Sequence, residues 1–191
     1  MDKNPNNLIW VDLEMTGLDV ASSTIIEIAL VITDQDLKEL GRWPFGNAGQ
    51  AIHQPADVLE KIDAWGRKTH TKTGLLERVC KSSVDLAAAE QEALALVQKY
   101  CPQPGSKRTA GCPLAGNSIG HDRAFLQAYM PRLEQYTSYR NVDVSTIKEL
   151  VKRWHPDDLY VKADTGKHGA MPDILASIKE LQHYRSKVFS S

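Results

Sequence analysis

Two acidic residues near the start of the chain have the spacing of a paired metal-binding site. Asp12 and Glu14 are two residues apart and follow the apolar run 8–11, which is typical of a β-strand. On a strand their side chains project from the same face. Two carboxylates so close repel each other and resist desolvation unless a cation or hydrogen-bond donors compensate. An isolated pair of this kind is more often a solvated strand end, so it needs support from elsewhere.

Asp122 provides some of that support. It lies in a predicted helix that begins near Ser118, three and four residues before Phe125 and Leu126. These apolar residues belong to a stripe that continues to Leu133, so Asp122 is on the buried face. The alternative is an ordinary acid in a first helical turn, which the helix dipole favours.

The last group of candidates is His168 and Asp173. Pro172 favours the first turn of a helix, which places Asp173 in that turn and His168 on the Gly-containing loop before it. The plain interpretation of each is a solvated loop histidine and an ordinary N-terminal helix acid.

Together, four carboxylates and one histidine make a recognisable set. Hard oxygen ligands select Mg²⁺ or Mn²⁺ rather than zinc. Two such ions about 4 Å apart can activate a water and stabilise a leaving alkoxide in phosphodiester hydrolysis. A histidine suits the role of general base.

The elements that would position these residues follow from hydrophobic periodicity. Strands are predicted at 8–11, leading into Asp12, and at 25–33. A third strand is predicted after a turn at 34–36, and a further extended piece around 50–53. Consecutive strands so close in sequence must pair antiparallel. Residues 55–100 switch to helical spacing, clearest from Leu86 to Tyr100, with Ser82 or Ser83 as the cap. Further strands near 109–115 and 140–144 alternate with helices from about 118, 145 and 172, and 155–167 is predicted to be a loop. We expect one α/β domain over residues 1–191, a mixed sheet covered by helices.

Charge and composition limit the partners. The 191 residues include 23 Lys and Arg against 24 Asp and Glu, a formal net charge of −1. Proteins that grip long nucleic acids usually carry a basic excess, so any nucleic-acid substrate should be held through few phosphates or through metal ions. No apolar run approaches the roughly 20 residues that span a bilayer, and the N-terminus lacks a signal or transit pattern. Three cysteines without a CxxC motif favour a reducing compartment.

The order of these residues resembles the DEDDh class of 3′→5′ exonucleases, and within it the oligoribonuclease family. The motifs that carry the resemblance cover nearly the whole chain: NLIWVDLEMTGL at 7–18, IIEIA at 25–29, RKTHT at 67–71, GLLER at 74–78, GNSIG at 116–120 and VDVST at 142–146. The resemblance implies an RNase H-like mixed five-stranded sheet with one antiparallel strand, flanked by helices. It also implies hydrolysis of very short single-stranded RNA, chiefly 5′-phosphorylated dinucleotides, to 5′-mononucleotides.

By the same resemblance, Asp12, Glu14, Asp122 and Asp173 would hold two divalent cations, Mg²⁺ or Mn²⁺, and His168 would deprotonate the attacking water. Leu18, Trp65 and His70 match residues that line the base pocket, and Ser118 matches a contact near the phosphate. Residue type alone would place Trp65 in the core and His70 on the surface. Four further positions match residues that reach from the second subunit of a homodimer to cap the 5′ phosphate: Tyr139, Arg140, Ser145 and Thr146. Tyr139 also matches a residue that is counted as part of the active site.

The sequence departs from the family pattern in places. Pro172 replaces an acidic residue beside Asp173, His121 stands beside Asp122 where an amide is usual, and residues 41–50 look long and Gly-rich. Glu27, in mid-strand among isoleucines, is expected to be a buried acid with a partner. Two alternatives remain: a broader DEDDh exonuclease acting on long strands, and a non-catalytic nucleotide-binding module. We expect a cytoplasmic protein without membrane attachment, or a mitochondrial one if a presequence has been removed.

Overall fold

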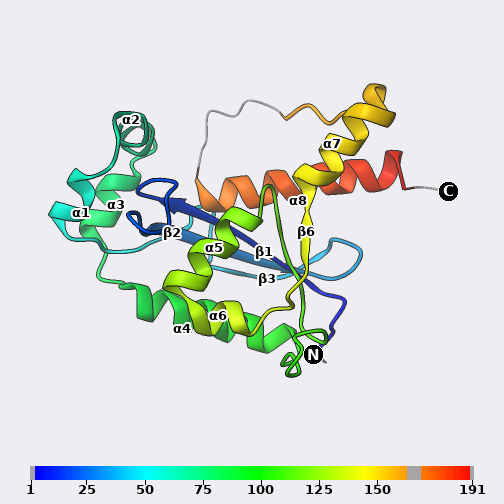
Figure 1. The fold of residues 1–191 in the computed structure, drawn as a ribbon, viewed down its shortest axis with the longest axis horizontal. Helices are drawn as coiled ribbons and strands as arrows, with labels where there is room; N and C mark the ends of the chain where they lie inside the picture. Colours follow the sequence, from blue (N-terminus) through cyan, green and yellow to red (C-terminus); the bar gives the residue numbers. More distant parts are fainter. Residues whose placement is uncertain (1–2, 163–168, 190–191) are drawn as a thin grey trace.

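The computed structural model describes residues 3–162 and 169–189, which form a mixed sheet between two layers of helices (Figure 1). The strands are β1 (Leu8–Met15), β2 (Ile25–Thr33), β3 (Glu39–Trp43), β4 (Gln50–Ala51), β5 (Leu114–Gly116) and β6 (Asn141–Asp143). Their order is β3-β2-β1-β5-β6, with β4 also paired to β2. β2 is antiparallel to β1, β3 and β4, whereas β1, β5 and β6 are parallel. The predicted mixed sheet with one antiparallel strand is confirmed; the two-residue β4 adds a sixth strand.

The two faces of the sheet bury different side chains, as the twofold alternation of a strand requires. Ile9, Val11 and Leu13 of β1 pack into the core beneath α4 (Leu86–Tyr100), α5 (Gly120–Tyr129) and α6 (Pro131–Gln135). Trp10 packs into the opposite core, beneath α7 (Val144–Trp154) and α8 (Ala170–Lys187). Figure 1 shows α4 and α8 on opposite sides of the sheet. All nine residues of β2 are buried, since both faces of this strand are covered.

Three short helices cover one end of the sheet. α1 (Ala56–Glu60), α2 (Ala64–Lys72) and α3 (Leu75–Lys81) form a small core against Ile26 and Ala51. A 3₁₀ turn at Pro156–Asp158 follows α7 within the predicted loop 155–167, of which residues 163–167 lie outside the described part. No helix among the described residues is long and apolar enough to cross a membrane.

Several element boundaries differ from the prediction for local reasons. Asp85, rather than Ser82 or Ser83, caps α4 by accepting the Ala88 N–H at 2.8 Å. The apolar stripe from Phe125 to Leu133 predicted one helix, but α5 ends at Tyr129 and Leu133 lies in α6. Pro131 causes the break because it has no N–H to donate and disfavours helical geometry at Met130.

Candidate active site

The centre of the site is a pair of carboxylates on β1. Asp12 and Glu14 lie on the same face of the strand, as their spacing predicted, and Glu14 faces Glu27 of β2 in the antiparallel register. Glu14 keeps 22% of its side chain exposed, so the pair borders solvent rather than lying in a closed core. Three carboxylates therefore converge from two adjacent strands.

Asp122 reaches this pair from the first turn of α5. Its Oδ1 accepts the Leu13 N–H at 3.0 Å, which places the carboxylate beside the backbone of Leu13, the residue between Asp12 and Glu14. Only 7% of the residue is exposed, which agrees with its predicted place on the buried helix face.

Asp173 approaches from the opposite helix layer, in the first turn of α8. Its Oδ2 accepts the Gly169 N–H at 3.1 Å. Gly169 has φ +148°, a conformation that L side chains rarely adopt, so a glycine suits this entry to the helix. One oxygen from each of Asp12, Glu14 and Asp173 lies within 4.8 Å of the other two. The predicted base, His168, falls outside the described residues.

Asp12, Glu14 and Asp122 have raised pKa values and so hold protons more tightly than ordinary acids. Burial, then the charges of Asp122 and Glu14, raise the pKa of Asp12 well above its usual range. Burial, then the charge of Glu27, raises the pKa of Glu14 to about 8. Burial also raises the pKa of Asp122 to about 7, against the lowering effect of its backbone hydrogen bonds. A bound multivalent cation would favour the ionised form of these carboxyl groups, because its charge offsets their mutual repulsion and the cost of burial.

The donor set fits a hard divalent cation. Its described members are carboxylate oxygens that converge at the edge of solvent, and such oxygens are what Mg²⁺, Mn²⁺ and Ca²⁺ prefer. The group of possible ligands among the described residues contains only carboxylates. Of the three cysteines, Cys101 and Cys112 are buried in the core beneath α4, and Cys80 is exposed on α3. The site therefore has the chemistry of a divalent metal centre.

Glu27 has the partner that its burial required. Its side chain is fully buried, and its Oε1 pairs with Arg78 Nη2 of α3 at 2.5 Å. Its Oε2 accepts the Ala170 N–H at 3.1 Å, at the start of α8. Sequence reasoning missed Arg78, although the motif at 74–78 contained it. Through these contacts Glu27 connects β2, α3 and the helix that carries Asp173.

The residues of the expected base pocket have the opposite exposure from that suggested by residue type. Trp65 is 75% exposed and Leu18 is 77% exposed, whereas His70 is buried. His70 Nδ1 lies 3.9 Å from Glu14 Oε2, and Nε2 lies 3.2 Å from the Met15 carbonyl oxygen. Burial lowers the pKa of His70, so a neutral ring contacts the carboxylate cluster. The expectations of a core Trp65 and a surface His70 were wrong.

The polar residues predicted near the phosphate form two groups. The Ser118 hydroxyl donates to Ser145 Oγ at 3.2 Å, and both backbone N–H groups donate to Asp143 Oδ1. Thr146 is exposed in the same first turn of α7. In the second group Arg140 Nε donates to the Tyr139 hydroxyl at 3.1 Å, and its guanidinium lies 5.3 Å from the centre of the Tyr139 ring.

Comparison with known proteins agrees with the fold. A family model described as "Exonuclease" matches residues 9–181. Among solved structures, a zinc-bound complex of Escherichia coli exonuclease I with single-stranded DNA superposes with a TM-score of 0.72 at 13% identity, covering 98% of this chain and 41% of the other. The fold is thus that of an exonuclease of the RNase H-like type.

Sequence relatives define the class more closely. An oligoribonuclease of Shewanella baltica is 49% identical over 189 residues, and one of Shewanella sp. strain W3-18-1 is 48% identical over the same length. Each alignment covers 99% of both chains. This chain belongs to the oligoribonuclease family of DEDDh exonucleases.

Proposed function

We propose that this chain is a 3′→5′ exoribonuclease that hydrolyses very short single-stranded RNA, chiefly 5′-phosphorylated dinucleotides, to 5′-mononucleotides. The observation that carries the proposal is the convergence of Asp12, Glu14 and Asp173 oxygens within 4.8 Å, with Asp122 hydrogen-bonded between the first two. The named activity of the full-length Shewanella relatives supports the same conclusion.

Asp12, Glu14, Asp122 and Asp173 would hold two divalent cations, Mg²⁺ or Mn²⁺. Such ions, when bound, lower the pKa of water and neutralise charge that develops on the phosphate. His168 would accept the proton of the attacking water. His70, held neutral against the Met15 carbonyl, would orient Glu14 and form one wall of the base pocket.

Exposed apolar side chains would bind the bases. Leu18 follows β1 and would wedge between the two bases, and Trp65 of α2 would offer a ring on which one of them stacks. Base stacking of this kind is tolerant of sequence because every base has an aromatic face. It therefore suits an enzyme that clears many different short RNAs.

Ser118 would make a contact near the phosphate, and the 5′ phosphate would be capped by Tyr139, Arg140, Ser145 and Thr146. The contact between the Ser118 and Ser145 hydroxyls favours a contribution of both from one chain. Tyr139 and Arg140 would reach across a homodimer, so a substrate with a longer 5′ extension would collide with them. We further propose that residues 1–191 act as a single exonuclease domain in the cytoplasm.

The length of the preferred substrate tests the proposal. Purified protein with Mn²⁺ is incubated with 5′-phosphorylated diribonucleotides and, separately, with 20-residue RNA and DNA strands. We expect kcat/KM to be at least about 100-fold higher for the dinucleotide, because a longer 5′ extension would collide with Tyr139 and Arg140. A 100-fold difference corresponds to about 3 kcal/mol in transition-state binding. Equal or faster turnover of the long strands would favour a broader exonuclease, in line with the single-stranded DNA complexes of exonuclease I that share the fold.

An Asp12→Asn variant tests the role of the carboxylates. The substitution removes a metal-binding oxygen and relieves charge repulsion, so hydrolysis should stop while the fold remains. Asp57→Asn, at an exposed position in the first turn of α1, is the matched control and should keep full activity. Persistent hydrolysis by Asp12→Asn would refute the assignment of Asp12.

A further inference from the structure

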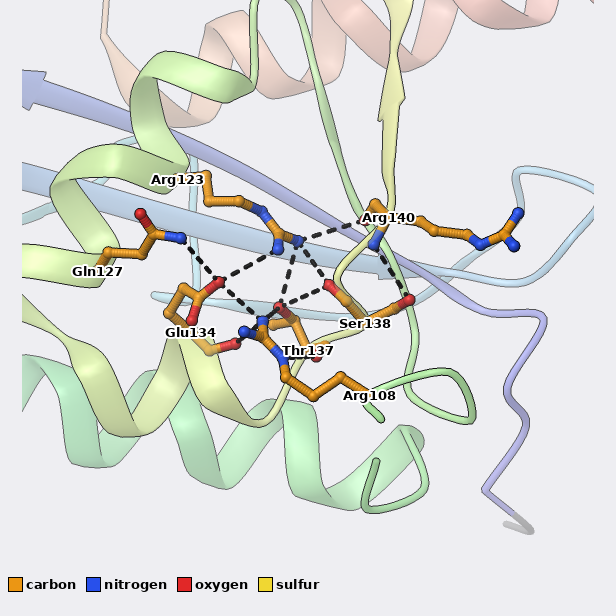
Figure 2. A network of polar contacts seen from close by, with 7 residues as sticks. All are labelled: Arg108, Arg123, Gln127, Glu134, Thr137, Ser138 and Arg140. Carbon is orange, nitrogen blue, oxygen red and sulfur yellow. Dashed lines mark hydrogen bonds and ion pairs between the residues drawn. The ribbon is translucent and has the colours of Figure 1, made fainter. Parts of the chain in front are cut away.

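A buried cluster of charged residues holds the segment that carries Tyr139 and Arg140 (Figure 2). Thr137 and Ser138 are buried, at 0% and 3% exposure, whereas Tyr139 is 51% exposed and Arg140 is exposed. The backbone of this segment is therefore anchored while its two functional side chains project outward. Figure 2 shows the Arg140 side chain pointing away from the cluster.

Arg123 anchors the segment from α5. Its Nη2 donates to the carbonyl oxygens of Ser138, at 2.7 Å, and of Arg140, at 3.3 Å. Its Nη1 donates to Glu134 Oε1 of α6 at 3.1 Å. Arg123 directly follows Asp122 in the sequence, so one turn of α5 contacts both the carboxylate cluster and this segment.

Arg108 anchors the segment from the loop before β5. Its Nη2 donates to Glu134 Oε1 and to the Glu134 carbonyl, each at 2.7 Å, and its Nε donates to the Thr137 carbonyl at 3.0 Å. Its own carbonyl accepts the Tyr139 N–H at 3.3 Å. The segment is thus held from both sides by planar guanidinium groups, each of which makes several hydrogen bonds in a fixed geometry.

The cluster is a costly way to stabilise a fold. It places two guanidinium groups around one carboxylate that is 4% exposed, so desolvation offsets much of the attraction. Apolar side chains would pack the same space more simply. The guanidinium groups fix the positions of the carbonyl groups of residues 137, 138 and 140. They therefore also fix the backbone that carries the Tyr139 and Arg140 side chains.

We propose that Arg108, Arg123 and Glu134 are positioning residues that preorganise Tyr139 and Arg140 for the 5′ phosphate. This inference rests on the proposed function, because it assumes that Tyr139 and Arg140 contact that phosphate. In this role the cluster would not contact the cations or the RNA itself; it would act through the backbone of residues 137–140. A side chain held in its binding geometry loses less conformational entropy when substrate arrives.

The Arg108→Met variant is the sharpest test, because Arg108 lies in a loop and is distant in sequence from the carboxylates. Arg123 and Gln127 remain as partners of Glu134, so we expect the variant to fold. We expect the preference in kcat/KM for 5′-phosphorylated over unphosphorylated dinucleotide to fall on the order of ten-fold, through KM, because two side chains must be ordered on binding. Amide hydrogen exchange across 137–140 should accelerate, while the rise in Tm on adding Mn²⁺ should stay the same. Arg185→Met, which removes an exposed partner of Asp36, is the control and should alter none of these.

A mutant cycle separates positioning from direct contact. If Arg108 acts only through the segment, Arg108→Met should reduce the preference no further in a background that carries both Tyr139→Ala and Arg140→Ala, because that background lacks both side chains that the cluster positions. Additive losses, or faster hydrogen exchange with an unchanged preference, would overturn the proposal. A wild-type protein that hydrolyses dinucleotides without preferring the 5′ phosphate would overturn this inference and the proposed cap together, but not the exonuclease assignment. A wild type without hydrolysis would instead refute the proposed function.

Discussion

Desolvation distinguishes Asp12, Glu14 and Asp122 from the many acidic residues that end strands and begin helices. The sequence alone left the solvated interpretation open for each of them, because spacing sets the direction of a side chain but not what covers it. The covering elements are α5 and the start of α8, which approach β1 from opposite layers. That the acidic residues from separate elements come together could be predicted from the sequence. How deeply each carboxylate is buried could be known only from the fold.

The raised pKa values make a prediction about stability and pH. A carboxyl whose pKa is higher in the folded than in the unfolded state stabilises the fold at low pH and loses this effect as pH rises. For Glu14 the window runs from the ordinary value of 4.5 to about 8. The metal-free protein should therefore unfold at a lower Tm at pH 8 than at pH 5, by about 5 °C.

Thermal unfolding in EDTA and in Mn²⁺ measures this effect. The cation replaces protons in the cluster, so its stabilising effect should grow with pH over the same window. Asp12→Asn should be less sensitive to pH than wild type in EDTA, and its Tm should barely respond to Mn²⁺. An Mn²⁺ effect that is equal at pH 5 and pH 8 would contradict this account of the cluster.

Trp65 and His70 show why residue type can mislead. Tryptophan is usually well buried and histidine is usually intermediate, but a helix that borders a binding site can present its largest apolar side chain to solvent. The motif at 67–71 contained His70, and only the fold revealed that it faces Glu14. The resemblance to the family assigned both residues to a base pocket, which is tertiary information that one sequence alone lacks.

Trp65→Ala should therefore affect substrate binding rather than stability. Loss of one base-stacking surface should raise KM for a dinucleotide about ten-fold, with Tm nearly unchanged because the side chain is already exposed. Phe45→Ala, which removes an even more exposed aromatic ring, is the control and should leave KM unchanged. Steady-state kinetics and thermal unfolding together check the prediction; a large loss of stability in Trp65→Ala would contradict it.

At the scale of the elements, apolar periodicity predicted β1, β2, α4 and α8 well, because each has one or two faces in a core. It did not predict the break at Pro131 or how closely Gly49 approaches Glu27 of β2. Gly49 is required there: a Cβ would lie 2.6 Å from Glu27 Cγ, and the Gly49 carbonyl accepts a hydrogen bond from Arg78 Nη1 at 3.0 Å. Such close approaches depend on contacts between residues distant in sequence, which a single sequence does not display.

Glu27 connects β2, α3 and α8, and this connection predicts that a double variant is more stable than one of its single variants. Arg78→Met leaves the buried Glu27 carboxylate without its countercharge. We expect a loss of about 2 kcal/mol, which is below the range of about 3–5 kcal/mol for broken buried pairs because Arg78 is partly exposed. Adding Glu27→Gln should restore part of that loss. Lys81→Met, on the same helix but in an exposed pair with Glu77, should leave stability unchanged. Chemical denaturation measures all three, and a double variant less stable than Arg78→Met would contradict the charge argument.

At the scale of the whole molecule, the net charge of −1 bears on substrate length. A long strand is usually held by many basic side chains, and each neutralised phosphate releases counterions and steepens the dependence of affinity on salt. In this protein Arg123 and Arg108 are used internally, where they hold Glu134, rather than presented to a strand. Arg140 is exposed and remains available to a phosphate.

Salt dependence then separates a short-RNA enzyme from one that tracks long strands. A His168→Ala variant keeps the four carboxylates, so it should bind RNA without cleaving it in Mn²⁺, and its affinity for a 5′-phosphorylated dinucleotide and for a 20-residue strand can be measured from 50 to 300 mM KCl. A site that contacts about two phosphates predicts a slope of log K against log salt near −1.4 for both RNAs, since single strands contribute about −0.7 per phosphate. Arg140→Ala, added to this variant, should make the slope shallower by about 0.7. A slope that steepens with strand length would mean that residues beyond the pocket bind the backbone, and the charge balance would then have to be explained by a local basic surface rather than by a short substrate.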